Sequence, residues 1–131
     1  MTAATDIVIV AARRTPMGGF QGDFRDLTAP ELGAAALKAA VADARLGAAD
    51  VEQVVMGCVL PAGQGQAPAR QAALKAGLEL STAAVTLNKM CGSGMKAVMD
   101  AHDALKAGSA DIIAAGGMES MTNAPYLLPK A

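Results

Sequence analysis

The sequence predicts an α/β fold in which strands and helices alternate along the chain. Three observations support this prediction. Short apolar runs rich in strand-forming residues recur, longer helix-like segments separate them, and capping residues stand at the ends of those segments. The resulting order, βαβαβαβ, indicates a mostly parallel sheet with crossover helices on both faces. In such sheets, ligands bind at the carboxyl ends of the strands.

The first two expected elements are a strand and a helix. Residues 7–11 form a continuous apolar, β-branched run, as expected of a strand buried on both faces. After a polar connection, Thr28 and Glu31 have the spacing of a capping box. The sequence therefore predicts a helix that extends to about Leu46 and ends at Gly47, since glycine commonly follows the last helical residue.

The remaining elements continue the alternation. Further strands are expected at residues 53–60, 83–88 and 111–115. Helices are expected from Pro68 to Gly77 and from Ser93 to Ala107, the second closed by Gly108. Residues 118–131 show no periodicity. We therefore expect an α/β domain over residues 1–117 and the start of a second region over residues 118–131.

Composition excludes several classes of protein. Hydrophobic residues make up 53% of the 131 residues and aromatics only 2%, so the core must consist of small and medium aliphatic side chains. A formal net charge of −1 and the lack of a basic stripe speak against a nucleic-acid partner. The two cysteines give no disulfide framework, which favours a reducing, cytoplasmic location. The apolar run at residues 7–12 is too short for a membrane helix and lacks the basic start of a signal peptide, so no membrane partner is expected.

Cys91 is the candidate nucleophile. It lies between a strand-like run and a helix-like run, with Gly92 and Gly94 beside it, so the backbone is expected to turn sharply there. A helix N-terminus favours negative charge, and the thiolate is the reactive form of cysteine. A thiol on a strand-to-helix turn is therefore suited to nucleophilic catalysis. Cys58, inside a predicted strand, is interpreted as a core residue.

The only histidine does not fit as the base for this thiol. His102 lies eleven residues beyond Cys91, which is roughly 15 Å along a helix. We expect it to be a packed, hydrogen-bonded residue on one helical face with Met95, Val98 and Leu105. Met95 and Met99 are interpreted as core or interface residues. The glycine pairs elsewhere match no phosphate-binding pattern, and no metal site is expected.

Four motifs in their order along the chain resemble those of the thiolase family. They are IVIVAARRTP at residues 7–16, LPAGQGQAPARQAA at 60–73, NKMCGSGM at 88–95 and AGGMESM at 115–121. The form Cys-Gly-Ser-Gly is similar to the biosynthetic, acetyl-CoA-condensing type. The resemblance implies the N-terminal half of a thiolase, without its final strand, followed by the opening of the loop domain that covers coenzyme A.

The resemblance also implies an activity. Thiolases of this type condense two acetyl-CoA molecules to acetoacetyl-CoA and CoA, and the reverse reaction is thiolysis. Cys91 would hold the acetyl group as a thioester, and its backbone N–H would form part of an oxyanion hole. Coenzyme A thioesters would be substrates, and no separate cofactor is implied. The segment at residues 64–70 resembles one that packs across a dimer interface, which implies a homodimer or homotetramer.

The family's other catalytic residues are absent from this sequence. A histidine that activates the nucleophile and a second cysteine that acts as base lie in Gly-x-His and Cys-x-Gly motifs, and neither motif occurs here. We therefore expect this chain to need a complementary C-terminal portion. A proteolytic piece, a nicked enzyme and a truncated gene product would all account for the omission. The alternative is a non-catalytic, thiolase-like assembly module.

Overall fold

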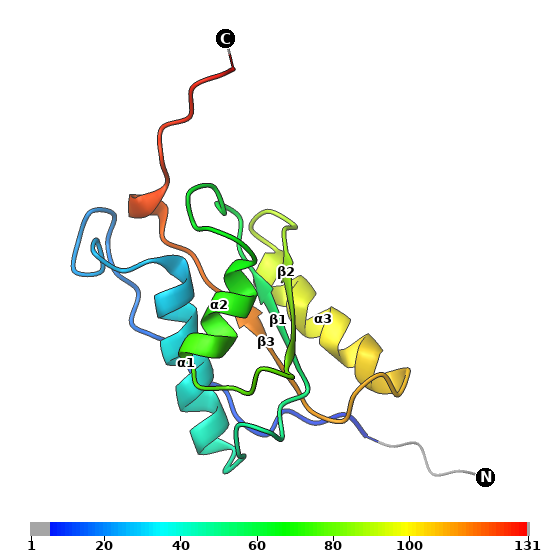
Figure 1. Ribbon diagram of the computed structural model, residues 1–131. Coiled ribbons are helices and arrows are strands. Elements are labelled where there is room, and N and C mark those ends of the chain that lie inside the picture. Colours follow the sequence, from blue (N-terminus) through cyan, green and yellow to red (C-terminus); the bar gives the residue numbers. More distant parts are fainter. Residues whose placement is uncertain (1–5, 131) are drawn as a thin grey trace.

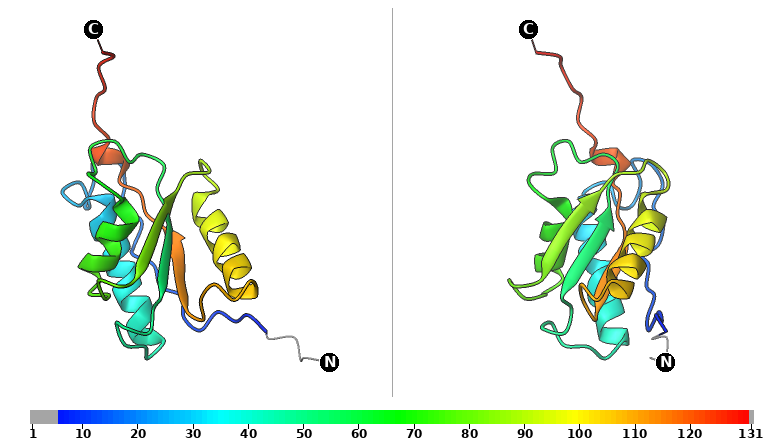
Figure 2. Two further views of the ribbon diagram at one scale, coloured as in Figure 1. Left: turned by 45° about the vertical axis from the view of Figure 1, so that its right-hand side comes forward. Right: turned by 90° about the vertical axis from the view of Figure 1, so that its right-hand side faces the viewer.

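The computed structural model describes residues 6–130 and shows a sheet with helices on both faces (Figure 1). Residues 1–5 and 131, the outer ends of the two expected domains, lie outside the described residues. The elements in order are α1 (Ala29–Asp43), β1 (Gln53–Gly57), α2 (Pro68–Lys75), β2 (Ala83–Leu87), α3 (Ser93–Lys106), β3 (Ile113–Gly117) and the 3-10 turn η1 (Met121–Asn123). Figure 2 shows α1 and α2 on one face of the sheet and α3 on the other.

The sheet is parallel and has the order β2-β1-β3. In the register, Val55 of the central strand lies between Val85 and Ala115. The three strands start and end together, so the turns that follow them meet at one edge. The predicted α/β class, the parallel sheet and the coverage of both faces are confirmed.

The prediction of a first strand at residues 7–11 is wrong. This segment is not hydrogen-bonded as a strand, and Val8, Ile9 and Val10 are 69%, 80% and 69% exposed. β-branched composition favours an extended chain, but a strand forms only where a neighbouring backbone pairs with it. The sheet ends at β2 on one side and β3 on the other, and residues 7–11 pair with neither of these strands nor with any other described segment. The sheet therefore has three strands in place of the four expected.

Helix α1 begins as the sequence predicts but ends earlier. Thr28 and Glu31 form both hydrogen bonds of the capping box. At the other end, Arg45 takes the left-handed conformation with φ 58°, and the Leu46 N–H bonds to the Val41 carbonyl oxygen at 3.1 Å. The expectation that Gly47 ends this helix is therefore wrong. By contrast, the glycines predicted to close α2 and α3, Gly77 and Gly108, do have positive φ.

The main core lies between the sheet and the helix pair α1 and α2. Its residues are small or of medium size, as the composition predicts: Ala29, Leu37, Val51, Val54, Met56, Cys58, Ala69, Ala72, Ala73, Leu78 and Met118. On the other face, Ala97 and Ala101 of α3 are buried. Met95 and Met99 are 74% and 52% exposed, so they are not core residues of this chain, and of the two expected roles an interface remains a prediction. In the described part of the chain, no helix has the length and apolarity needed to cross a membrane.

Candidate active site

The structure places Cys91 at the carboxyl edge of the sheet, between the end of β2 and the start of α3. Its side chain is exposed, whereas Cys58, the other cysteine, is buried. No side-chain hydrogen bond caps the N-terminus of α3. The two other helices differ: Thr28 caps α1, and the Thr86 hydroxyl accepts a hydrogen bond from the Ala69 N–H of α2 at 2.9 Å. The accessible thiol therefore lies beside the uncapped N-terminus of a fourteen-residue helix. Partial positive charge is concentrated at such a helix end.

The turn that carries Cys91 is formed by a residue that sequence reasoning missed. Gly92 has an ordinary φ of −86°, and the left-handed residue is Met90, with φ 50°. A non-glycine residue in this region is strained and is retained only where its surroundings fix it. Ser93 helps to hold Met90 in this conformation. Its buried hydroxyl donates to the Met90 carbonyl oxygen at 2.5 Å and accepts from the Lys89 N–H at 2.8 Å. The expectation that Gly92 and Gly94 make the sharp turn is thus corrected.

The glycines of the site allow close packing instead. A Cβ added to Gly57, the last residue of β1, would lie 2.6 Å from the Ser93 carbonyl carbon and 2.8 Å from the Gly94 nitrogen. A Cβ on Gly117, the last residue of β3, would lie 3.2 Å from the Gly94 Cα. The first turn of α3 can therefore rest directly on the ends of two strands. This close approach sets the position of Cys91 above the sheet edge.

Two polar residues lie next to the site, and neither was assigned a role from the sequence. They belong to the motifs at residues 88–95 and 115–121. Asn88 follows β2, and its side-chain oxygen accepts the Met90 N–H at 2.9 Å. Glu119 follows β3, and its carboxylate accepts the N–H groups of Val59 and Leu60 at 2.9 and 3.0 Å. Their position was the available signal, because Asn88 comes directly after β2 and Glu119 comes two residues after β3, and ligands bind at the carboxyl ends of parallel strands.

Cys58 is an inert core residue, as the sequence predicts, although it lies one residue beyond β1. It is 1% exposed, and its Sγ lies 3.8 Å from a Glu119 carboxylate oxygen. Burial raises the pKa of the Cys58 thiol to about 11, and the nearby negative charge and hydrogen bond of Glu119 add to this. The Cys58 thiol therefore stays protonated at neutral pH.

His102 lies far from the turn, near the C-terminal end of α3. Its Nδ1 is 3.1 Å from a carboxylate oxygen of Asp103, so the predicted hydrogen bond is present. Its side chain is 52% exposed, so the expectation that it is packed is wrong. Cys91 and His102 are thus not brought together. No group of three or more histidine, cysteine, aspartate or glutamate residues suited to a metal ion occurs among residues 6–130.

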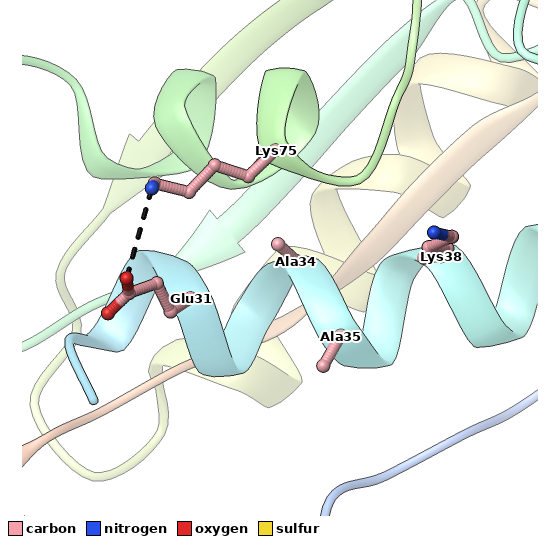
Figure 3. Close-up of a pocket in the computed structure, with 5 residues that line it drawn as sticks. All are labelled: Glu31, Ala34, Ala35, Lys38 and Lys75. Carbon is pink, nitrogen blue, oxygen red and sulfur yellow. Dashed lines mark ion pairs between the residues drawn. The ribbon is translucent and has the colours of Figure 1, made fainter. Parts of the chain in front are cut away.

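Two of the depressions on the described surface differ in their position relative to Cys91. The larger, about 290 Å³, lies between α1 and α2, where the Lys75 ammonium approaches the Glu31 carboxylate at 4.0 Å (Figure 3). None of its lining residues belongs to the Cys91 turn. The smaller, about 150 Å³, is lined by Arg13, Arg14, Thr15, Leu32, Gly33, Ala36, Gly117, Met118 and Glu119. It therefore reaches the carboxyl end of β3, at the same sheet edge as Cys91.

The comparison with known proteins agrees with this geometry. A family model described as "Thiolase, N-terminal domain" matches residues 7–131. Similar curated proteins include an acetyl-CoA acetyltransferase of Cupriavidus necator, 54% identical over 95% of this chain, and one of Pseudomonas aeruginosa, 52% identical over 96% of this chain. The mitochondrial acetyl-CoA acetyltransferase B of Xenopus laevis is 53% identical over 95% of this chain.

A solved structure supports the same assignment. The crystal structure of a thiolase from Ascaris suum in complex with coenzyme A matches 94% of this chain with a TM-score of 0.92 and 37% sequence identity. This chain covers 32% of that structure and 30–32% of the three curated relatives. It therefore spans about a third of the length of the proteins that it resembles.

Proposed function

The chain belongs to the thiolase family, whose N-terminal domain it matches over residues 7–131, and on this basis we propose that it supplies the nucleophile of an acetyl-CoA acetyltransferase. The observation that carries the proposal is the exposed Cys91 thiol on a strained turn at the uncapped start of α3. The names of the similar proteins, and the coenzyme A in the Ascaris suum structure, support acetyl-CoA as the substrate.

In the first proposed step, the Cys91 thiolate attacks the carbonyl carbon of acetyl-CoA. The C–S bond to coenzyme A breaks, coenzyme A leaves as its thiolate, and acetyl-Cys91 remains. One thioester is broken and another is formed, so the transfer is reversible. The oxygen that becomes negative needs fixed N–H donors, and the Cys91 N–H at the start of α3 is the donor we assign.

In the second step, a base removes a proton from the methyl group of another acetyl-CoA. The resulting carbanion attacks the acetyl-Cys91 carbonyl, acetoacetyl-CoA forms, and Cys91 leaves as thiolate. Neither His102 nor Cys58 can be this base, because His102 is far along α3 and Cys58 is buried against a carboxylate. We assign the base, and the residue that activates Cys91, to a polypeptide portion outside these 131 residues.

The experiment uses the complete protein, by which we mean this chain together with the C-terminal portion proposed above. It is incubated with acetyl-CoA, quenched with acid and digested. Mass spectrometry should find one acetyl group on the peptide that contains Cys91. The Cys91→Ala variant should carry none, and Cys58→Ala should be acetylated like the wild type. A wild-type protein that folds, binds coenzyme A and is never acetylated would contradict the enzyme proposal and favour a non-catalytic, thiolase-like module.

The same proposal includes self-association through residues 64–70. This loop has a defined shape, because the Gln71 side-chain amide donates to the carbonyl oxygens of Gln64 and Gln66 at 2.6 and 2.8 Å. Within this segment residues 65–67 are exposed, whereas Pro68 and Ala69 belong to α2 and are buried. A shaped, exposed turn can be reproduced in each copy, as a symmetric interface requires. Light scattering of the complete protein should give the mass of a dimer or tetramer, and a monodisperse monomer would contradict this part.

A further inference from the structure

Asn88 is in contact with two segments that are far apart in the sequence. Its Oδ1 accepts the Met90 N–H at 2.9 Å, and its Nδ2 donates to the Val59 carbonyl oxygen at 3.2 Å. A backbone N–H can only donate and a carbonyl can only accept, so the orientation of this amide is fixed by its partners. Asn88 therefore ties the turn before Cys91 to the loop that follows β1.

Glu119 holds the other side of that loop. Its Oε2 accepts the Val59 N–H at 2.9 Å, and its Oε1 accepts the Leu60 N–H at 3.0 Å. Hydrogen bonds to a carboxylate are stronger than those between neutral groups. Val59 thus donates its N–H to Glu119 and offers its carbonyl oxygen to Asn88, which makes the connection from Glu119 to Asn88 continuous.

The turn needs this support because of the backbone at Met90. Its φ of 50° is unfavourable for a residue with a side chain, and such conformations persist only where neighbouring groups hold them. Met90 directly precedes Cys91, so a change in the Met90 torsion angles would redirect the thiol. Two anchors act on Met90: Ser93 holds its carbonyl oxygen, and Asn88 holds its N–H.

We infer that Asn88 and Glu119 are positioning residues for Cys91, with Glu119 acting through the Val59 peptide and Asn88. The consequence for acetyl transfer rests on the proposed function, whereas the consequence for the shape of the turn does not. Neither side chain needs to contact the substrate. Their effect is to keep Cys91 aimed at one point above the sheet edge.

The first test measures the turn itself by hydrogen exchange in the complete protein. Asn88→Ala and Glu119→Gln should each speed exchange in a peptide covering residues 88–95, about tenfold or more for a locally opened segment. In Glu119→Gln the new amide nitrogen faces a backbone donor, so one of the two hydrogen bonds is lost. Asn123→Ala is the matched control, because Asn123 also donates to backbone carbonyls but lies in η1.

The exchange pattern separates the inference from its alternative. If Glu119→Gln speeds exchange only at residues 58–60 and leaves residues 88–95 as in the control, Glu119 stabilises only the loop after β1 and the inference is overturned. Asn88→Asp keeps the acceptor for Met90 but places an oxygen against the Val59 carbonyl. It should give an intermediate exchange rate, and it tests the link should Asn88→Ala fail to fold.

The second test compares a directed reaction with an undirected one at Cys91. Acetylation by acetyl-CoA needs an aligned thiol, whereas alkylation by iodoacetamide needs only an accessible one. Asn88→Ala should slow acetylation by about tenfold to a hundredfold, the range that follows from small misplacements, and should leave alkylation within about threefold of wild type. Equal slowing of both reactions would show lost access and overturn the positioning role. A wild type that is never acetylated would refute the proposed function, and the exchange pattern would still decide the inference.

Discussion

Gly57 at the end of β1 lies directly beneath Ser93 in the first turn of α3. A Cβ on Gly57 would come within 2.6 Å of both the carbonyl carbon and the Cβ of Ser93. Because the obstacle is backbone, it cannot move aside without shifting the whole helix start. This contact joins the end of a strand to the residue two positions after Cys91.

The first prediction is that Gly57→Ala both destabilises the fold and misplaces the thiol. The free energy of unfolding should fall by about 2–3 kcal/mol, in the range of overpacked sites, as measured by urea unfolding. Gly19→Ala is the control, since a Cβ there meets no atom within 4 Å, and it should change the same quantity by less than about 0.5 kcal/mol. An unchanged Gly57→Ala protein would show that α3 does not rest on β1 as described.

The second prediction concerns selective labelling of the two cysteines. Brief iodoacetamide treatment at neutral pH should alkylate Cys91 and leave Cys58 unmodified, because Cys58 is buried and its pKa is raised to about 11. Peptide mapping by mass spectrometry measures both sites in one sample, and urea-unfolded protein is the control in which both react. Equal or preferential labelling of Cys58 in the folded protein would contradict the assignment of the nucleophile.

The third prediction tests the capping box at the start of α1. Thr28→Ala removes the two hydrogen bonds of the Thr28 hydroxyl, one to the Glu31 carboxylate and one from the Glu31 N–H, and should lower the free energy of unfolding by about 1 kcal/mol. The bond from the Thr28 backbone N–H to the Glu31 carboxylate is kept. The bonds from Thr28 lower the pKa of Glu31 from 4.5, so their stabilising effect is present above that pH and is lost as the pH falls through the folded-state pKa.

The difference between wild type and Thr28→Ala should therefore shrink on acidification below pH 4.5. Urea unfolding at neutral and acid pH measures it. Glu79→Gln, a change at an exposed carboxylate, is the control for lost charge alone. A Thr28→Ala effect that is the same at both pH values would mean that the bond from the Thr28 hydroxyl to the Glu31 carboxylate does not stabilise the fold.

The fourth prediction is that the 131 residues alone do not turn over acetoacetyl-CoA. Neither His102, far along α3, nor the buried Cys58 can act as the base, and apolar side chains such as Val8, Ile9 and Met95 are largely exposed. The isolated chain should therefore be inactive in thiolysis and poorly soluble. Co-expression with the C-terminal part of an acetyl-CoA acetyltransferase should restore activity and solubility. Full turnover by the chain alone, with its mass verified, would show that the base lies within it.

The sequence by itself determined what depends on neighbouring residues. Thr28 and Glu31 form the predicted capping box, Gly77 and Gly108 follow the ends of α2 and α3 as predicted, and Cys91 lies at the predicted junction of a strand and a helix. Each of these features is governed by local hydrogen bonds or by the steric freedom of one residue. Such information is contained within a few positions of the chain.

Tertiary structure alone decided the features that need a distant partner. Residues 7–11 have strand composition but no strand, because β-sheet pairing requires a second backbone. Met90, not a glycine, takes the left-handed position at the turn; the neighbouring Asn88 and Ser93 hold it, and contacts distant in the sequence hold Asn88. One of those contacts runs from Asn88 to Val59, 29 positions earlier, and Val59 in turn bonds to Glu119, 60 positions away. A pattern of neighbouring residues cannot predict contacts between residues so far apart in the sequence. Such contacts form only when parallel strands bring their carboxyl ends to one edge of the sheet.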